Sequence, residues 1–172
     1  MKFLAKSLLL ACIVFSVSQC QQAPVPKEKE AFVKRYDRPD ATILKGVEVS
    51  EGNAYFFSSG MVGPVLDTTA ALGDPKRYGD TYTQSIGALT RIEASLKEAG
   101  LSMKDVIKLN VYIAPDQAKE GVIDFEAWFN AYKEFFVNEK NPNKVARTTL
   151  GVAALAREGL LVEVEVIAVY PK

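Results

Sequence analysis

The chain contains no histidine, and this absence removes several common catalytic arrangements. A Ser-His-Asp triad, a Cys-His pair and a His-based zinc site all require an imidazole. The two cysteines, Cys12 and Cys20, both lie in the first 20 residues. The body of the chain therefore has neither a disulfide nor a thiol nucleophile, and we expect no metal site.

An excess of charge of one sign is also missing. Lys plus Arg number 21 and Asp plus Glu number 21, with no basic block anywhere. Binding to phosphate backbones needs clustered Lys and Arg, so nucleic acid is not expected as a partner. A length of 172 residues with an ordinary apolar content fits one domain plus an appendage, and no internal repeat or second domain is apparent.

The appendage is expected at the N-terminus, where a short basic start over 1–6 precedes an apolar run over 7–17. That run is too short for a spanning helix but is typical of the apolar region of a secretory signal. We predict a signal peptide over 1–19. The alternative is a buried helix of the folded protein.

Val17-Ser18-Gln19-Cys20 resembles a bacterial lipobox, in which the cysteine is lipidated and becomes the new N-terminus. Cleavage before Cys12 would leave too short an apolar run, so Cys20 is the predicted lipidation site. Cleavage near 16–18 without a lipid is the alternative. Residues 20–38 are expected to form a flexible tether and 39–172 the folded domain. The protein would then be exported, either periplasmic or attached to a membrane through Cys20.

Apolar periodicity and turn residues predict the elements of the body. Six strands and two helices are expected. The predicted strands are 42–49, 54–58, 61–66, 106–113, 145–153 and 160–169. The predicted helices are 81–99 and 121–137. This order favours an α+β fold in which two helices pack on one face of a mixed sheet. The aromatic stripe of the second helix, which includes Phe129 and Tyr132, is expected to be core.

The last predicted strand alternates between two kinds of side chain. Glu163 and Glu165 fall on one face of it, and Val162, Val164 and Val166 on the other. The face without helices is left half apolar, so we expect a partner subunit to cover it.

Four segments resemble the reactive intermediate deaminase family, RidA/YjgF, and together they cover roughly residues 41–170. They are Phe57-Ser-Ser-Gly60, the helix and strand within 83–113, the helix 124–136, and Ala146-Arg-Thr-Thr149 with the strand 162–169. The resemblance implies a chorismate-mutase-like fold, a homotrimer and three clefts between subunits. It also implies hydrolysis of enamines or imines of the 2-aminoacrylate type to a ketoacid and ammonia, without a cofactor.

The same resemblance assigns roles to individual residues. Arg147 is expected to grip a substrate carboxylate, Glu163 to position and activate water, and Thr149 to offer its backbone N–H and hydroxyl. For Arg147 the alternative is an ion pair with Glu165 across a final hairpin. The strand register, which decides whether Arg147 and Glu163 face one cleft, does not follow from the sequence.

Four further residues are expected to line the substrate site. They are Asn130, Ser59, Gly60 and Ile43. Ile43 stands where many family members have a tyrosine, and Leu155-Ala156 replaces a usual Leu-Pro, so the substrate range is open. An exported, non-catalytic binder of a carboxylate ligand on the same scaffold is the alternative function. A ribonuclease role is the least favoured, because of the charge and the missing histidine.

Overall fold

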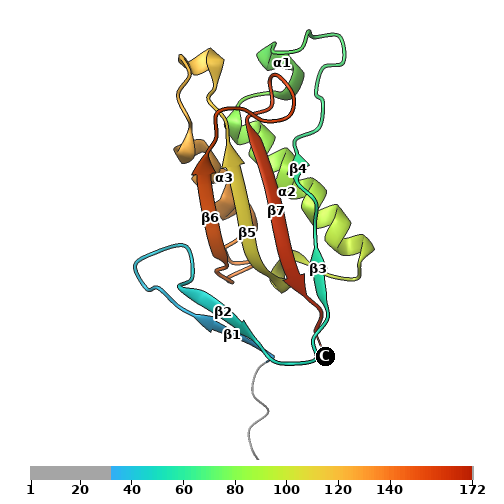
Figure 1. Ribbon diagram of the computed structural model, residues 1–172, viewed down its shortest axis with the longest axis vertical. Coiled ribbons are helices and arrows are strands. Elements are labelled where there is room, and N and C mark those ends of the chain that lie inside the picture. Colours follow the sequence, from blue (N-terminus) through green and yellow to red (C-terminus); the bar gives the residue numbers. More distant parts are fainter. Residues whose placement is uncertain (1–31, 172) are drawn as a thin grey trace, which may run out of the picture. The chain divides into compact units, whose positions relative to one another are not determined.

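Two long antiparallel strands, β5 and β7, lie side by side in the central sheet of the computed structural model (Figure 1). The structure describes residues 32–171, so the predicted signal peptide, Cys20 and most of the predicted tether lie outside the described residues. Within this part the five-stranded sheet has the order β3-β7-β5-β6, and β4 also pairs with β7. The strands are β3 (Tyr55–Phe57), β4 (Met61–Val62), β5 (Val106–Ile113), β6 (Ala146–Gly151) and β7 (Val162–Val169).

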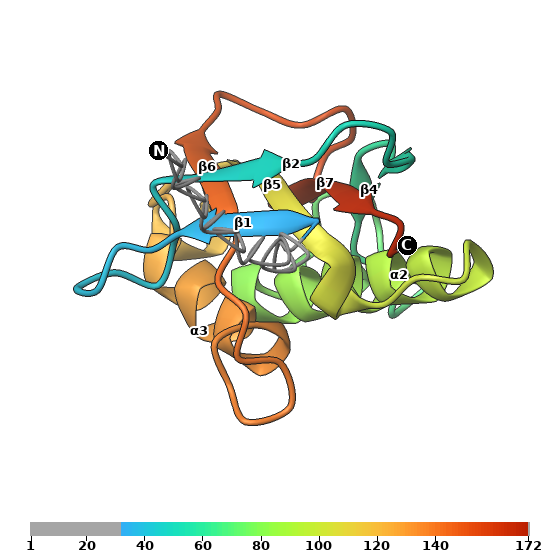
Figure 2. The same cartoon turned by 90° about the horizontal axis from the view of Figure 1, so that it is seen from below.

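Two helices, α2 (Thr81–Glu98) and α3 (Phe125–Phe135), cover the same face of this sheet, as Figure 2 shows. Leu89 and Ile92 of α2 and Trp128 of α3 are fully buried against the sheet. The helix α2 ends where the sequence predicts, because Gly100 takes the left-handed conformation with φ of 75° and the N–H of Leu101 donates to the carbonyl of Leu96. The predicted mixed sheet with two helices on one face is confirmed.

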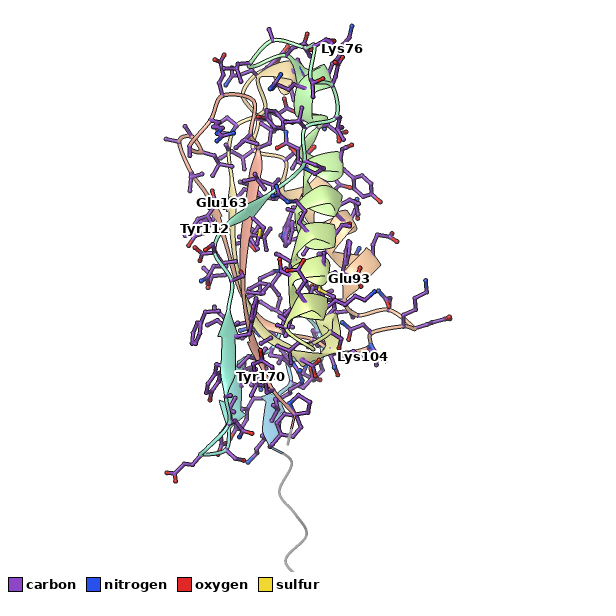
Figure 3. The ribbon with its side chains drawn as sticks, turned by 90° about the vertical axis from the view of Figure 1, so that its right-hand side faces the viewer. Lys76, Glu93, Lys104, Tyr112, Glu163 and Tyr170 are labelled. Atoms are coloured by element: carbon purple, nitrogen blue, oxygen red, sulfur yellow. The ribbon has the colours of Figure 1, made fainter. Side chains whose placement is uncertain are left out.

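The alternation predicted for the last strand is also confirmed. Val162, Val164 and Val166 are buried under the helices, while Glu163 and Glu165 are only half-buried. In Figure 3, Glu163 lies on the side of the sheet away from α2. We call this side, which carries no helix, the open face.

The last two strands do not form a hairpin, although the sequence suggested that they did. β6 pairs in parallel with β5, and β5 separates it from β7. The segment between β6 and β7 therefore crosses the end of β5. The alternative for Arg147, an ion pair with Glu165 across a hairpin, is thus wrong: the two residues lie on strands that are not neighbours.

The N-terminal end of the described chain is a strand and not part of a tether. β1 (Val33–Tyr36) pairs antiparallel with β2 (Gly46–Val49), which is shorter than the predicted strand over 42–49. Arg35 anchors β1 to the body: Nη1 donates to the carbonyl of Lys144 at 2.8 Å, and Nη2 donates to the carbonyls of Lys104 and Val106 at 3.2 Å. The folded unit therefore begins before residue 39, and the predicted tether is too long at this end.

Smaller differences follow from local capping. α3 begins at Phe125 and not at 121, because Asp124 accepts a hydrogen bond from the N–H of Ala127. The segment 67–79, between the predicted strand 61–66 and the predicted helix 81–99, contains the short helix α1 (Pro75–Tyr78). The other short elements are η1 (Met103–Asp105) and η2 (Gln117–Lys119). In the described region no helix combines the length and apolar character that a membrane crossing requires.

Candidate functional site

Arg147 lies on the outermost strand of the sheet, β6, and points towards α3. Its register partner on β5 is Leu109, which is fully buried under the helices, so both side chains share the helix-covered face. The guanidinium carbon of Arg147 lies 4.3 Å from the centre of the Tyr132 ring and 5.0 Å from the centre of the Phe129 ring. Two aromatic rings of α3 therefore hold the cation in place.

This guanidinium has no ion-pair partner among residues 32–171. Nη1 of Arg147 is buried without a hydrogen-bond partner, and Arg147 belongs to neither of the ion pairs found within residues 32–171. Burial lowers the pKa of Arg147, and the nearby Tyr132 opposes that shift. A buried, unpaired cation is costly, so this arrangement favours an anionic ligand such as a carboxylate.

Thr149 and Ile43 lie near Arg147. Thr149 follows two residues later on β6, on the same face, and its hydroxyl oxygen is buried without a partner. The hydroxyl of Tyr132 donates to the carbonyl of Thr42 at 3.1 Å. The adjacent Ile43 is half-buried and is held in the loop beside this ring. Arg147, Thr149 and the loop at Ile43 thus form one cluster, which we call the Arg147 cluster.

Asn130 belongs to the margin of the Arg147 cluster. It is exposed on α3, next to Phe129 in the chain. Its helical position turns it away from the fully buried Ala131 and Trp128, so it can meet only a ligand or a partner that approaches from outside.

Glu163 forms a second cluster on the open face. A methyl group added at Gly60 would lie 1.8 Å from Oε1 of Glu163, so the carboxylate packs directly on the Gly60 backbone. Ser59 is exposed beside it, whereas the hydroxyl of Ser58 accepts a hydrogen bond from the N–H of Val166. The structure thus brings Glu163, Gly60 and Ser59 together, and we call them the Glu163 cluster.

The two glutamates of β7 have different surroundings. Glu165 accepts hydrogen bonds from the Asn110 amide at 3.3 Å and from the Tyr112 hydroxyl at 3.4 Å. Glu165 is the first cause of the raised pKa of Tyr112. Glu163 instead lines a cavity of about 380 Å³. Glu163 is therefore the better placed of the two to meet water and a ligand.

The two clusters lie on opposite faces of the sheet. Arg147 is on the helix-covered face of β6, and Glu163 is on the open face of β7, with β5 between them. Lys108 confirms the assignment of faces, because its Nζ donates to the hydroxyl of Thr148, the open-face neighbour of Arg147. One small ligand cannot touch Arg147 and Glu163 of the same chain.

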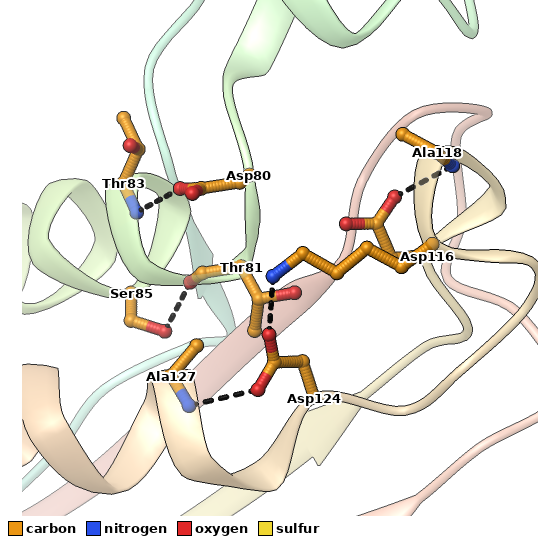
Figure 4. A network of polar contacts seen from close by, with 9 residues as sticks. Asp80, Thr81, Thr83, Ser85, Asp116, Ala118, Asp124 and Ala127 are labelled. Carbon is orange, nitrogen blue, oxygen red and sulfur yellow. Dashed lines mark hydrogen bonds and ion pairs between the residues drawn. The ribbon is translucent and has the colours of Figure 1, made fainter.

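A larger cavity of about 580 Å³ lies elsewhere, at the loops that end the strands. Asp116 and Lys119 line it, and the nearby ion pair of Lys119 with Asp124 belongs to the polar network of Figure 4. Neither Arg147 nor Glu163 reaches this cavity. Among residues 32–171 no group of three or more Asp, Glu, His or Cys side chains could hold a metal ion.

Sequence reasoning missed two residues of the Arg147 cluster. Phe129 and Tyr132 were expected to be core, and Tyr132 is indeed buried, but Phe129 is 39% exposed and both rings face the guanidinium. Their spacing of three residues places them on one side of α3, which was the available signal. The sequence does not show that β6, the strand that carries Arg147, packs against this side of α3.

A comparison with protein families decides the identity of this scaffold. A family model described as Endoribonuclease L-PSP matches residues 45–170. The chain belongs to the RidA/YjgF family. The resemblance expected from the sequence is confirmed, together with the fold that it implied.

Relatives of this RidA/YjgF chain include proteins of varied origin. A RutC family protein of Pyrococcus abyssi is 33% identical over 137 residues, covering 80% of this chain and 93% of the relative. A protein of Dermatophagoides farinae named 2-iminobutanoate/2-iminopropanoate deaminase is 34% identical over 121 residues, covering 70% of this chain and 81% of the relative.

Solved structures of RidA/YjgF proteins show the same fold. E. coli TdcF, crystallised with bound serine, superposes with a TM-score of 0.53 at 28% identity, covering 80% of this chain and 99% of TdcF. The E. coli YjgF gene product superposes with a TM-score of 0.52 at 28% identity, covering 72% of this chain and 85% of that protein.

Proposed function

We propose that this RidA/YjgF protein hydrolyses imines or enamines of small 2-amino acids to ketoacids and ammonia, without a cofactor. The observation that carries the proposal is the Arg147 guanidinium, which contacts the rings of Phe129 and Tyr132 and has no ion-pair partner in the part of the chain that the structure describes. A guanidinium binds a carboxylate through two parallel hydrogen bonds. The deaminase name of one relative supports the reaction.

The opposite placement of the two clusters leads to a second part of the proposal. A homotrimer would bring the Arg147 cluster of one protomer against the Glu163 cluster of its neighbour and so form three equivalent clefts. The open face is suited to such contacts, since Phe57 is 68% and Leu150 is 50% exposed on this small protein. The active cleft would then exist only in the assembly.

The chemistry in this cleft needs few groups. Arg147 binds the carboxylate, and Glu163 of the neighbour takes a proton from water as the water oxygen bonds to the imine carbon. Glu163 passes this proton to the imine nitrogen, which gives a carbinolamine. When its C–N bond breaks, the nitrogen takes the hydroxyl proton and leaves as ammonia, and the oxygen remains as the ketone. Thr149, whose hydroxyl is free in the chain, is placed to donate to the bound carboxylate. Holding a reactive imine beside water supplies much of the acceleration.

The test is ketoacid formation by the purified full-length chain from freshly generated 2-aminoacrylate. We expect a rate above that in buffer, and we expect Arg147→Ala to remove it. A folded protein with no rate above buffer would contradict the deaminase proposal. Binding without turnover would support instead a carrier of small carboxylates, a function that the serine bound to TdcF favours.

A ribonuclease function, which the description of the family model names, is not proposed here. The chain has no histidine and no excess of positive charge. Phosphodiester hydrolysis and RNA binding commonly depend on such groups.

Export is proposed as well, on the sequence of the leader alone. Lipidation of Cys20 would attach the protein to a membrane, while cleavage near 16–18 would release it. Replacing Cys20 with Ser should move the protein from the membrane fraction to the soluble fraction of the exported material. Retention in the membrane fraction would contradict lipidation at this residue.

A further inference from the structure

Two arginines flank the cavity that contains Glu163. Arg157 lies on the segment between β6 and β7, and Arg91 lies on α2; both line the cavity of about 380 Å³ together with Gly60, Tyr78 and Glu163. Three separate parts of the chain thus bring two arginines and one glutamate to the lining of a single cavity.

The charges in this cavity are unbalanced. Among residues 32–171 neither Arg91 nor Arg157 belongs to an ion pair. Arg91 is held in place because its Nη1 donates to the carbonyl of Val62 at 3.1 Å, which leaves its other N–H groups for a ligand. With Glu163 ionised, the lining still carries one positive charge in excess, and a hollow of this size is large enough for a small organic acid.

We propose that Arg157, assisted by Arg91, binds a second carboxylate of the substrate, so that the preferred substrates are imines of 2-amino dicarboxylic acids. The inference rests on the proposed deaminase function. The carboxylate next to the imine carbon occupies Arg147 of one protomer, and the imine carbon lies at Glu163 of the neighbour. The side chain of the substrate then extends into the cavity beside Glu163, where only a second anion neutralises the two guanidinium groups.

The anion is assigned as a carboxylate because of the reaction. The proposed chemistry acts on imines derived from amino acids, and the amino acids that bear a second anionic group on the side chain are aspartate and glutamate. Hydrolysis of either imine consumes one water and gives the ketoacid and ammonia, so no further reactant is required. A charge-assisted hydrogen bond in a partly open site contributes about a tenfold preference in binding.

The test compares two imines made in the assay by amino-acid oxidases, one from aspartate and one from alanine. We expect the full-length protein to show a higher kcat/KM for the aspartate imine. In Arg157→Ala the ratio of the two kcat/KM values should fall by about tenfold, mainly through KM, and Arg157→Lys should recover part of it. Lys76→Ala is the matched control, since it removes the same charge from α1 at a residue outside the cavity.

A ratio that stays within about twofold in Arg157→Ala would overturn the inference, even if both rates fall, because an arginine that merely orients Glu163 affects both imines equally. A different result would show that the proposed deaminase function itself is wrong. In that case the unaltered protein hydrolyses neither imine above the rate in buffer, and the inference falls with the function on which it rests.

Discussion

The Arg147 guanidinium lies 4.3 Å from the centre of the Tyr132 ring and has no carboxylate partner in the described part of the chain, residues 32–171. Burial raises the pKa of Tyr132, so the ring remains a neutral phenol that cannot balance the charge. The rings of Phe129 and Tyr132 offset part of the free energy of burying this cation, and an anionic ligand would offset more of it.

Replacing Arg147 with Met should therefore separate stability from function. Met fills a similar volume and removes the buried charge, so the midpoint of thermal unfolding is expected to stay the same or to rise. Imine hydrolysis should fall by at least about a hundredfold, because the carboxylate loses its charged partner. Differential scanning calorimetry and a ketoacid assay measure both effects. A clear fall in the unfolding temperature would mean that Arg147 is structural.

Gly60→Ala should disturb the Glu163 cluster in a specific way. The new methyl group would lie 1.8 Å from Oε1 of Glu163, which forces the carboxylate to another rotamer and away from the position proposed for it beside the attacking water. Because the atom displaced is the flexible end of a side chain, we expect little loss of stability but at least a tenfold loss of kcat. Gly46→Ala is the control, since nothing lies within 4 Å of the added methyl group. Equal activities of the two variants would contradict the role of Glu163.

Helices and strands could be predicted from the sequence where the pattern that marks them lies within one segment of the chain. The alternation of Val and Glu over 162–169 and the periodicity of 81–99 depend on neighbours in the chain, and the structure confirms both. The parallel pairing of β6 with β5 could not be predicted, because it joins segments that are nearly 40 residues apart and either order of strands buries the same apolar face.

The same distinction applies to the candidate site. Arg147 and Glu163 could be singled out by their strand positions and the family resemblance. Their placement on opposite faces, and the rings of Phe129 and Tyr132 around Arg147, depend on packing between distant segments. β1 was missed because Val33–Tyr36 is only four residues long and its two central residues are basic. Three backbone carbonyls that accept hydrogen bonds from Arg35 fix it to the body.

Arg35→Ala should therefore destabilise the fold. Three carbonyl groups would lose their charged donor, and two of these contacts are partly buried. The expected loss is about 1–3 kcal/mol in the free energy of unfolding, measured with urea. Lys45→Ala, on the exposed side of the adjacent loop, should change it little. If the two variants unfold alike, β1 does not support the body.

Asp124 links acid stability to the helix that carries the aromatic rings. Its hydrogen bonds with the Lys119 ammonium, and next with the N–H of Ala127, hold the pKa of Asp124 below its usual value (Figure 4). A depressed folded-state pKa adds stability that is present above the unfolded-state pKa of about 4 and is lost as the pH falls through the folded-state pKa.

Asp124→Asn tests this linkage while it keeps the helix cap, because Asn caps a helix about as well as Asp. The variant should be slightly less stable than the unaltered protein near pH 7, and the difference should shrink towards about pH 3. Urea unfolding at the two pH values measures it. A difference that is the same at both would show that the Lys119 contact contributes no charge-dependent stability.

The central claim, that Arg147 and Glu163 of different copies share one active cleft, is tested most directly by mixing two inactive variants. Arg147→Ala and Glu163→Gln chains are co-expressed in equal amounts, and imine hydrolysis by the purified assembly is compared with that of each variant alone. Random assembly should restore both residues in about a quarter of the clefts, so about a quarter of the original activity should return. A mixture no more active than its parents would contradict the account.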